Sequence, residues 1–552
     1  MRSQTPLSLA LYLLAGAAQA QNTAKPAGQS SRQCRCVPGE SCWPSDDSWI
    51  KFNSTVGGKL IKSVPVAQSC YEGPTQDAKQ CKDVNNLWAD DDFQTEQPLG
   101  RFYPYNTTCP PDISETLQFA QDHDIRVSVV NTGHDLNARI DGFGSLAIWM
   151  RNYRNAIEFQ GTFQSATQCT QSGWTGHAIH VDGVYQCGDV HKVAQDHNVI
   201  IVGGGASSVG ANGGWLSGGG HGPASRNYGL GADQLLEADV MLADGRIVIA
   251  NHCQNADLFR ALRGGGPGYG IVLGTKIKAY PNVNVITAHH LTITPQATTD
   301  ENADLLDAIS IMMQSFPDLN EGGYAGLWTI GKGKAEADAI FTRVREKLSQ
   351  FKGKLVIHED FKEYDDYWSF YEGELDRGDF PGDTLLLTSR LLNKEAVQDY
   401  DSVRHTVEIV SGKPEEYTMN LVMLVSGGKV FEDAADTSSG LHPAWRNSSM
   451  VLLTARRISK SQTLTAADRQ AMADDITFTK GAATKRLAPD TGGYMNEGDP
   501  NDPYYKTTFY GDNYESHRAA KNKYDPNYVF YCPSCVGAEE FIDRPDGALC
   551  KK

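Results

Sequence analysis

Two stretches decide the fold of this chain: Asn131-Thr-Gly-His-Asp135, which follows the apolar run Val127-Ser-Val-Val130, and Gly203-Gly-Gly-Ala-Ser-Ser-Val-Gly-Ala-Asn-Gly-Gly-Trp-Leu-Ser-Gly-Gly-Gly-His-Gly222. A strand that opens into Asn-Thr-Gly-His presents backbone N–H groups that no bulky side chain shields, as a bound diphosphate requires. In the second stretch, the glycines let the backbone approach a flat, extended ligand along most of its length. Together the two stretches predict a site for a long ligand that carries a diphosphate.

Two further motifs complete a pattern, Gly229-Leu-Gly-Ala-Asp233 and Asp257-Leu-Phe-Arg-Ala-Leu-Arg-Gly-Gly-Gly266. With them, the chain resembles the FAD-linked oxidases of the vanillyl-alcohol oxidase superfamily, in particular the berberine-bridge-enzyme-like branch, over roughly residues 100–535. The motif Leu441-His-Pro-Ala-Trp-Arg446 is similar to one in the secreted, fungal isoamyl-alcohol-oxidase-like members. The resemblance implies an α+β protein. It would have a two-lobed FAD-binding domain of the vanillyl-alcohol oxidase (PCMH) type and a substrate domain whose antiparallel sheet is covered by helices.

The resemblance also assigns the cofactor site. In the family, the histidine at the position of His134 carries the flavin covalently, and a neutral imidazole is nucleophilic enough to attack the flavin 8α-methyl group. The alternative is a histidine that only forms a hydrogen bond in a turn. The other positions that the resemblance places at FAD are Asn131, Thr132, Gly133, Asp135, Gly204, Gly205, Val209, Gly210, Gly214, Ser217, Gly218, Gly219, Gly220, His221, Gly222, Gly231, Asp233, Ile271, Asn513 and Tyr514.

Many relatives form a second flavin bond, from a cysteine in the later glycine stretch. Here that position falls at Ala206, and the sequence has no cysteine between Cys187 and Cys253. We therefore expect a single covalent link, through His134. His221 could assist that link, face the substrate or have a structural role, and Asp233 is better suited to bracing loops than to catalysis.

The catalytic base is harder to locate from sequence. Relatives often carry Tyr-x-Asn-Tyr-x-Asp near the C-terminal segment, where this chain has Gly493-Tyr-Met-Asn-Glu-Gly-Asp499. Glu497, at the place of the second tyrosine, could accept a hydroxyl proton; the alternative is a loop carboxylate that helps the lobes to dock. Tyr494 is the second candidate, and His442 or Arg446 in the cap follow. The run His358–Glu372 could stack sugars, but it is more typical of an amphipathic helix.

Composition and cysteine usage indicate an exported globular protein. The 552 residues suggest two or more lobes, and the formal charge of −17 argues against nucleic acid or anionic membranes as partners. Residues 1–20 have the basic start, apolar stretch and Ala18-Gln-Ala20 site of a secretory signal, and no later run is long enough to span a membrane. An even count of 12 cysteines suits disulfides, and for Cys532-Pro-Ser-Cys535 a disulfide is favoured over zinc. Three glycosylation sequons begin at Asn53, Asn106 and Asn447.

We divide the chain into five parts. After the signal at 1–20 come a cysteine-braced extension (21–100), the FAD-binding domain (101–280), a substrate domain or cap (281–490) and a segment (491–552) that returns to the FAD-binding domain. In the second part of the FAD-binding domain, Glu237–Ala250 predicts a hairpin that turns at Asp244-Gly245. The cap alternates predicted strands, among them Tyr324–Ile330, with helices near 301–315, 334–350 and 394–410.

The sequence thus predicts a secreted, monomeric FAD-dependent oxidase without a metal. It would remove a hydride from a small molecule, at a carbon bearing a hydroxyl or amine, and reduce O2 to H2O2. An aliphatic or aromatic alcohol and a carbohydrate both remain open as substrates. One alternative is a biosynthetic flavoenzyme that cyclises or desaturates a secondary metabolite, and another is a flavin-free secreted binding protein on the same fold.

Overall fold

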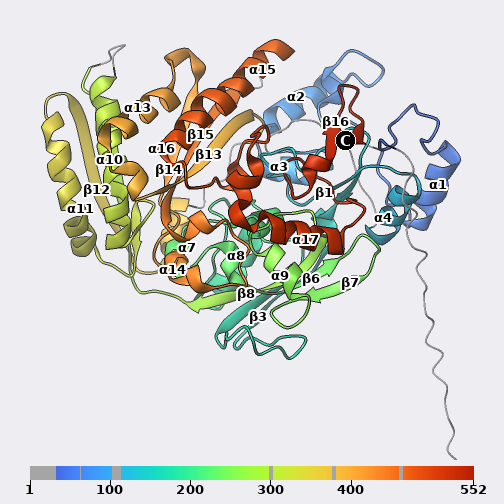
Figure 1. Cartoon of the computed structure of the whole chain (residues 1–552), viewed down its shortest axis with the longest axis horizontal. Coiled ribbons are helices and arrows are strands. Elements are labelled where there is room, and N and C mark those ends of the chain that lie inside the picture. Colours follow the sequence, from blue (N-terminus) through green and yellow to red (C-terminus); the bar gives the residue numbers. More distant parts are fainter. Residues whose placement is uncertain (1–32, 63, 102–112, 298–301, 376–380, 459–463) are drawn as a thin grey trace, which may run out of the picture.

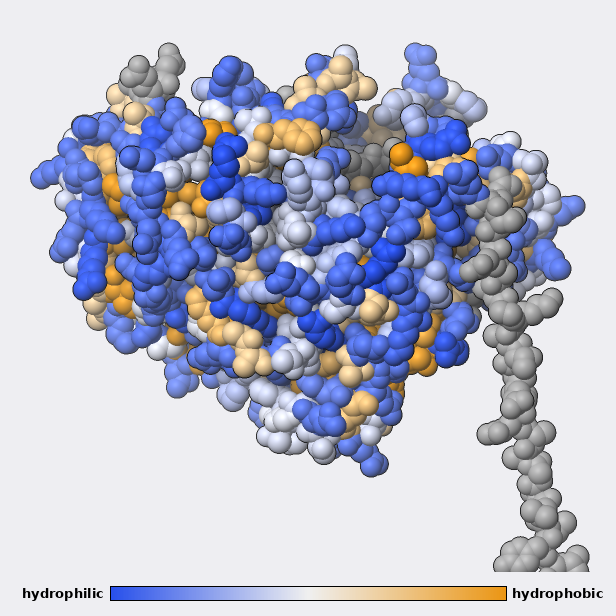
Figure 2. Space-filling model, in the orientation of Figure 1, coloured by the Kyte–Doolittle hydropathy of each residue, from blue (hydrophilic) through white to orange (hydrophobic). Residues whose placement is uncertain are grey.

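The computed structural model describes residues 33–62, 64–101, 113–297, 302–375, 381–458 and 464–552 (Figure 1). The predicted signal segment, the sequon at Asn106 and Cys109 lie outside the described residues. Within the described ranges, no helix combines the length and the apolar character needed to cross a bilayer. On the face drawn in Figure 2, hydrophilic residues dominate and apolar ones are scattered between them.

The FAD-binding part contains two sheets. In the smaller one, β1 (Val127–Val130) pairs in parallel with β2 (Leu146–Trp149). The larger sheet is antiparallel in the order β3 (Arg154–Gln160), β4 (His177–Gly183), β8 (Ile271–Pro281), β6 (Leu235–Met241) and β7 (Ile247–Ala250), and β5 (Val199–Ile200) also pairs with β8. The predicted hairpin is confirmed, since β6 and β7 pair around Asp244-Gly245. Strand β1 is buried and delivers the Asn131–Asp135 loop at its carboxyl end.

Short helices accompany the glycine stretch. Helix α5 (Cys187–Asp196) precedes it, α6 (Gly214–Ser217) lies within it, and α7 (Ser225–Tyr228) and α8 (Gly231–Gln234) follow it. The segment that follows the cap contributes α17 (Tyr514–Tyr524), which packs on α9 (Ala256–Leu262) in the FAD-binding part. Cys34–Cys550 joins the two ends of the described chain.

The cap consists of two antiparallel sheets with helices on one side. The first has the order β10 (Tyr324–Ala325), β11 (Trp328–Ile330), β9 (Ile286–Pro295), β12 (Leu355–Tyr364), and the second β13 (Thr384–Asn393), β15 (Ser448–Ile458), β14 (Thr418–Met423). Helices α10 (Ala303–Gly322), α11 (Lys334–Leu348), α13 (Tyr400–Ser411) and α16 (Gly481–Leu487) share its core (Figure 1, left). The predicted α+β class is confirmed.

Two predictions about cap elements are wrong. The segment Tyr324–Ile330 forms two short strands instead of one, because Gly326, at φ +66°, turns the chain between β10 and β11. The run His358–Glu372 is not one amphipathic helix. Its first half belongs to β12, which pairs with β9 over ten residues, and the only α-helix in it is α12 (Tyr367–Phe370). Pairing with a neighbouring strand outweighed local helical patterning there.

Disulfides brace the chain at five places, as the even cysteine count predicted. Besides Cys34–Cys550, the bonds are Cys36–Cys42, Cys70–Cys81, Cys169–Cys253 and Cys532–Cys535. Cys187, in contrast, is a buried free thiol. Its Sγ accepts a hydrogen bond from the Gly204 amide at 3.3 Å, and burial raises the pKa of the thiol to about 12. Cys187 therefore stays protonated and acts as a packing residue.

Candidate active site

A cavity of about 420 Å³ lies where the FAD-binding part, the cap and the returning segment meet. Both glycine-containing stretches line it, with strand β8 on one side and the cap strands β13, β14 and β15 on another. The returning segment contributes two groups of residues, Tyr494–Glu497 and Phe530–Cys532. Because residues from four distant parts of the chain converge here, this cavity is the candidate active site.

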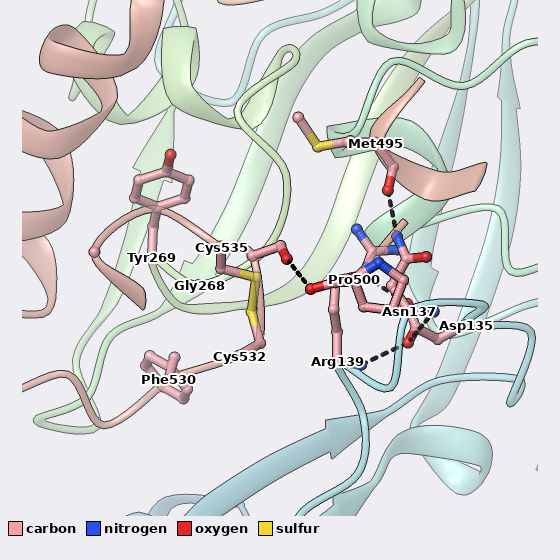
Figure 3. The surroundings of a disulfide bond; sticks show 12 residues. Asp135, Asn137, Arg139, Gly268, Tyr269, Met495, Pro500, Phe530, Cys532 and Cys535 are labelled. Carbon is pink, nitrogen blue, oxygen red and sulfur yellow. Dashed lines mark hydrogen bonds and ion pairs between the residues drawn. A yellow bond between two sulfur atoms is a disulfide. The ribbon is translucent and has the colours of Figure 1, made fainter. Parts of the chain in front are cut away.

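The loop after β1 is held rigidly at the edge of the cavity. The Asp135 carboxylate accepts hydrogen bonds from the backbone amides of Asn137 (3.2 Å) and Arg139 (2.6 Å), and it forms an ion pair with Arg139 Nε at 2.6 Å. Asn137 Nδ2 donates to the carbonyl of Met495 at 2.5 Å, which ties the loop to the returning segment (Figure 3). These contacts fix the position of the residue just before Asp135, His134.

His134 lines the cavity and is half-buried. Its Nε2 lies 2.9 Å from Ser208 Oγ, so the Asn131–Asp135 loop and the glycine stretch meet at this pair. Burial lowers the pKa of the imidazole from its ordinary value of 6.5 to about 3. His134 is consequently neutral at any ordinary pH, which is the form that can act as a nucleophile.

The glycine stretch divides into cavity-lining and packing positions. Of the residues predicted to contact FAD, the cavity is lined by Asn131, Thr132, Gly133, His134, Asp135, Val209, Gly210, Gly214, Ser217 and Ile271. Four of the other predicted positions, Gly218, Gly220, Gly222 and Gly231, are close-packed glycines outside the cavity lining. A Cβ on Gly222 would lie 1.8 Å from the Gly203 carbonyl oxygen, and one on Gly220 or Gly231 would meet Trp215 within 3 Å. A Cβ on Gly218 would lie 2.3 Å from Asn496 Oδ1. The remaining positions that do not line the cavity are Gly204, Gly205, Gly219, His221, Asp233, Asn513 and Tyr514.

Asp233 lies in an ion-pair network that connects the FAD-binding part to the cap. Its carboxylate accepts hydrogen bonds from Arg446 Nη1 (3.0 Å) and Nη2 (2.8 Å) and from the Leu230 amide, and Arg263 lies 3.8 Å away. Burial opposes ionisation, but Arg446 and Arg263 hold the pKa of Asp233 below its ordinary value. This position fits the bracing role that the sequence favoured for Asp233, and it places Arg446 in that network instead of the cavity.

Asn513 and Tyr514 likewise make protein contacts. Asn513 Nδ2 donates to the Leu441 carbonyl at 2.6 Å, and the Tyr514 hydroxyl donates to Glu539 at 2.6 Å. His442, the third candidate base, is buried outside the cavity. Its Nε2 lies 3.0 Å from the Thr507 carbonyl and its Nδ1 accepts the Ala444 amide at 3.0 Å. Since both ring nitrogens are engaged, His442 is not placed to take a proton from a ligand in the cavity.

The two leading candidates for the base both line the cavity. Glu497 Oε1 lies 3.1 Å from His221 Nε2. Its Oε2 is buried and, among the residues that the structure describes, has no hydrogen-bond partner. Tyr494 is buried beside it, and its hydroxyl accepts a hydrogen bond from Asn496 at 2.8 Å. Burial, with the nearby Glu497 charge, raises the pKa of Tyr494 above its ordinary value. The geometry therefore makes Glu497 the better acceptor of a proton, with His221 positioning it.

Sequence reasoning missed several cavity residues. Arg139 lines the cavity and donates to Asn496 Oδ1 at 3.1 Å, and Ser208 orients His134. The signal for Arg139 was its charge, which is opposite to that of Asp135 four residues earlier and suits a local ion pair within the loop. Cys532, at the start of the Cys532–Cys535 disulfide, also lines the cavity, close to Gly268 and Arg139 (Figure 3). No local signal marked it, because its place depends on how the returning segment folds back.

The cavity residues suit FAD. Glycine backbone and apolar side chains border most of the space, as a flat ring system and a long ribityl chain require. The buried oxygens Asn131 Oδ1 and Glu497 Oε2 lack hydrogen-bond partners within the described part of the chain, so both have capacity for a ligand. For a metal, the one candidate cluster of the described residues, Cys36, Glu40 and Cys42, is unsuitable because the two cysteines share a disulfide.

Comparison with known proteins agrees with this reading of the site. Residues 107–251 match the family described as FAD binding domain, and residues 493–537 match the family described as Berberine and berberine like. FAD-linked oxidoreductase hmp9 of Hypomyces subiculosus is 52% identical over 571 residues, which cover 94% of this chain and 91% of that protein.

Two solved structures extend the comparison. The VAO-type flavoprotein MtVAO713 from Myceliophthora thermophila C1 superposes with a TM-score of 0.92 at 52% identity, covering 94% of this chain and 100% of that chain. Glucooligosaccharide oxidase from Acremonium strictum, which carries a 6-S-cysteinyl, 8α-N1-histidyl FAD, has a TM-score of 0.59 at 18% identity, covering 82% and 98%. At that low identity, the second likeness speaks for the fold alone.

The fold and the site define an FAD-dependent oxidoreductase, an enzyme rather than a flavin-free binding protein. More narrowly, the chain belongs to the FAD-linked oxidoreductases of the vanillyl-alcohol oxidase family, in its berberine-bridge-enzyme-like branch.

Proposed function

We propose that this protein is a secreted, monomeric oxidase that carries FAD on His134 alone, removes a hydride from a small alcohol and reduces O2 to H2O2. The observation that carries the proposal is the pairing, in one cavity, of a histidine that desolvation keeps neutral with a buried carboxylate oxygen that has no hydrogen-bond partner among the described residues. The first group suits attachment of the flavin, and the second suits deprotonation of an alcohol.

His134 supplies the attachment. Ser208 and the loop around Asp135 hold the imidazole in one orientation. Little further side-chain entropy is therefore lost when the ring reacts with a ligand in the cavity. Bond formation at the flavin 8α carbon would remove one proton from that methyl group and one from the imidazole, and O2 would be the final acceptor of the electron pair. A second link is not expected, because Ala206 stands at the position of the relatives' cysteine and the nearest thiol, Cys187, is buried and protonated.

Glu497 performs the proton transfer. When bound, FAD supplies the acceptor for the substrate hydride and passes the electrons to O2. The Glu497 carboxylate takes the hydroxyl proton on Oε2 while His221 holds Oε1 at 3.1 Å. Tyr494, which is buried beside Glu497, carries no charge of its own and narrows the access of water to the carboxylate.

Secretion is proposed on separate grounds. Residues 1–20 have the features of a signal sequence, and disulfides such as Cys34–Cys550 form in oxidising compartments. The sequon residues Asn53 and Asn447 lie in the described part of the chain; the Asn53 side chain is half-buried, whereas Asn447 is exposed. We propose Asn447 as the better of these two glycosylation sites.

The attachment can be tested by acid precipitation of the purified protein. We expect a yellow pellet, and mass spectrometry of its peptides should find the flavin on the peptide that contains His134. In His134→Ala, the pellet should be colourless, while the native protein still retains some FAD through the unchanged backbone of the cavity. A wild-type supernatant that contains all of the FAD would contradict the covalent link, and a flavin–cysteine peptide would contradict the single link.

A further inference from the structure

The cap side of the cavity is entirely apolar within the described residues. The cap residues that line it are Leu385, Leu387, Met419, Leu421 and Leu453. They come from three strands, β13, β14 and β15, that pair side by side. We call these five residues the apolar wall. The possible substrates of an alcohol oxidase range from sugars to apolar alcohols, and these two classes require cavity walls of opposite polarity.

Strand register explains how the apolar wall forms. Ser389 pairs with Leu453, which pairs with Leu421, and one step along the strands Leu387 pairs with Ala455, which pairs with Met419. Residues two apart on a strand lie on the same face, about 7 Å from each other. The two cross-strand rows therefore present one continuous face, and the opposite face of the same sheet packs against cap helices.

The apolar wall lies beside the reacting groups. Ser389 exchanges hydrogen bonds with the backbone of Tyr494, so the wall begins where the loop that carries Glu497 is attached. At the other side, Leu136 packs against Leu387 and Leu453, two residues after His134. The wall thus extends between the proposed attachment point of the flavin and the proposed base.

Two members of the apolar wall lack full cover from the protein. Leu421 is 42% exposed and Met419 is 40% exposed, although each is a large apolar side chain facing the cavity. The charged pair Arg457–Asp383 lies one row further along the same sheet face, next to Leu385, and marks the end of the apolar surface. Exposed apolar side chains within a ligand cavity gain from contact with an apolar ligand.

We propose that the substrate is an apolar alcohol, whose hydrocarbon or aromatic body lies against the apolar wall while its hydroxyl group reaches Glu497. This proposal rests on the proposed oxidation of an alcohol at this site. A sugar is disfavoured because each of its ring hydroxyls would lose hydrogen bonds to water against leucine and methionine side chains that cannot replace them. The wall selects the body of the substrate, and the carboxylate selects its reacting group.

The test uses the flavin-loaded enzyme and two readouts. The first is anaerobic flavin reduction by linear primary alcohols from butanol to octanol, by benzyl alcohol and by cellobiose. The second is binding of the same compounds, followed by the change in the flavin absorption spectrum. Affinity should rise about two- to fourfold for each added CH2, which is the worth of a methylene group removed from water. Cellobiose should neither bind nor reduce the flavin measurably.

The variant Leu421→Asp should weaken octanol binding at least tenfold, because it places a carboxylate against the hydrocarbon chain. Val356→Asp is the matched control: Val356 is also an exposed apolar residue, at 51%, on the edge strand β12, away from the cavity. It should bind octanol like the wild type. If the two variants bind octanol with the same affinity, the proposal is overturned.

The two proposals can fail separately. If cellobiose reduces the flavin and the alcohols do not, the enzyme is an alcohol oxidase but the apolar substrate is refuted. If the alcohols bind with the expected chain-length dependence, and Leu421→Asp abolishes it, but none reduces the flavin, the apolar ligand stands and the oxidation of an alcohol fails. If no apolar alcohol binds, the apolar substrate is refuted whatever the enzyme oxidises.

Discussion

The two sides of the cavity are built in different ways. On the FAD-binding side, consecutive residues supply the site: Asn131 to Asp135 in one loop, and Val209 to Ser217 in the glycine stretch. On the cap side, the apolar wall takes alternate residues from three strands that are separated in sequence. The cofactor side depends on backbone and so on glycine, whereas the cap side depends on the side chains of one sheet face.

This difference teaches where function can vary. A glycine whose missing Cβ makes room for backbone, such as Gly222, tolerates no other residue. A leucine on a sheet face can be exchanged while the strand pairing remains. We therefore expect the cofactor side to be constrained by the fold and the cap side to set which substrate is oxidised.

The largest expected effect concerns Glu497, which lies between the two sides. Glu497→Gln retains the shape and the contact with His221 but cannot accept a proton, so flavin reduction should slow by roughly 100- to 10,000-fold. Reoxidation by O2 should hardly change, because Glu497 has no role in that step. Rapid-mixing absorbance measurements of the two half-reactions provide the test.

Tyr494→Phe is the control for that experiment. The raised pKa of Tyr494 keeps its hydroxyl neutral, so removing the oxygen should cost much less than Glu497→Gln. If Tyr494→Phe instead stops flavin reduction while Glu497→Gln reacts normally, the base is Tyr494. The assignment of proton transfer to the carboxylate would then be wrong.

The next effect tests the constraint on the cofactor side. Gly222→Ala forces a Cβ to within 1.8 Å of the Gly203 carbonyl oxygen, whereas a Cβ on Gly205 meets nothing within 4 Å. We expect Gly222→Ala to destabilise the protein by about 3 kcal/mol or more and to reduce the yield of flavin-loaded enzyme. Gly205→Ala should be within about 0.5 kcal/mol of the wild type.

Thermal unfolding and the ratio of flavin to protein absorbance measure both glycine variants. If both variants lose stability and flavin to the same extent, the glycine stretch needs backbone freedom throughout, not only at its close contacts. If both variants are as stable as the wild type, the contact at Gly222 relaxes, and the contrast between the two sides of the cavity loses its support.

The smallest effect is a pH dependence of stability. Burial lowers the pKa of His442 to about 4, compared with 6.5 for the ordinary imidazole. His442 therefore takes up a proton near pH 6.5 in the unfolded chain, but only near pH 4 in the folded protein. Stability falls as the pH decreases through this window, by at most about 1.4 kcal/mol per pH unit for one group.

His442→Gln removes this titration, and the glutamine amide can both donate to the Thr507 carbonyl and accept from the Ala444 amide. The fall in melting temperature between pH 7 and pH 5 should shrink by roughly 2–4 °C. His358→Gln, a substitution of an exposed histidine on β12, should leave that fall unchanged. An identical fall in all three proteins would show that His442 is not responsible.

Local motifs made much of the architecture predictable. The strand before Asn131, the glycine stretch and the β6–β7 hairpin each depend on neighbouring residues, and all three lie where the sequence placed them. The β12 segment was misread because its residues are mostly exposed at a sheet edge, so they carry little periodic signal. The local sequence pattern also did not reveal whether Asp233 contacts a ligand or, as the structure has it, Arg446 of the cap.

The sequence alone determined the class of protein. The motifs that carry the family resemblance, the glycine stretch and a histidine after a buried strand, are each formed by neighbouring residues. Only the tertiary structure decided which glycines face the cavity, that His442 is engaged on both ring nitrogens, and that Ser208 meets His134. It also decided the apolar wall, because strand register brings Leu387, Leu421 and Leu453 onto one face. Contacts between residues so distant along the chain depend on the packing of whole elements, which no short stretch of sequence encodes.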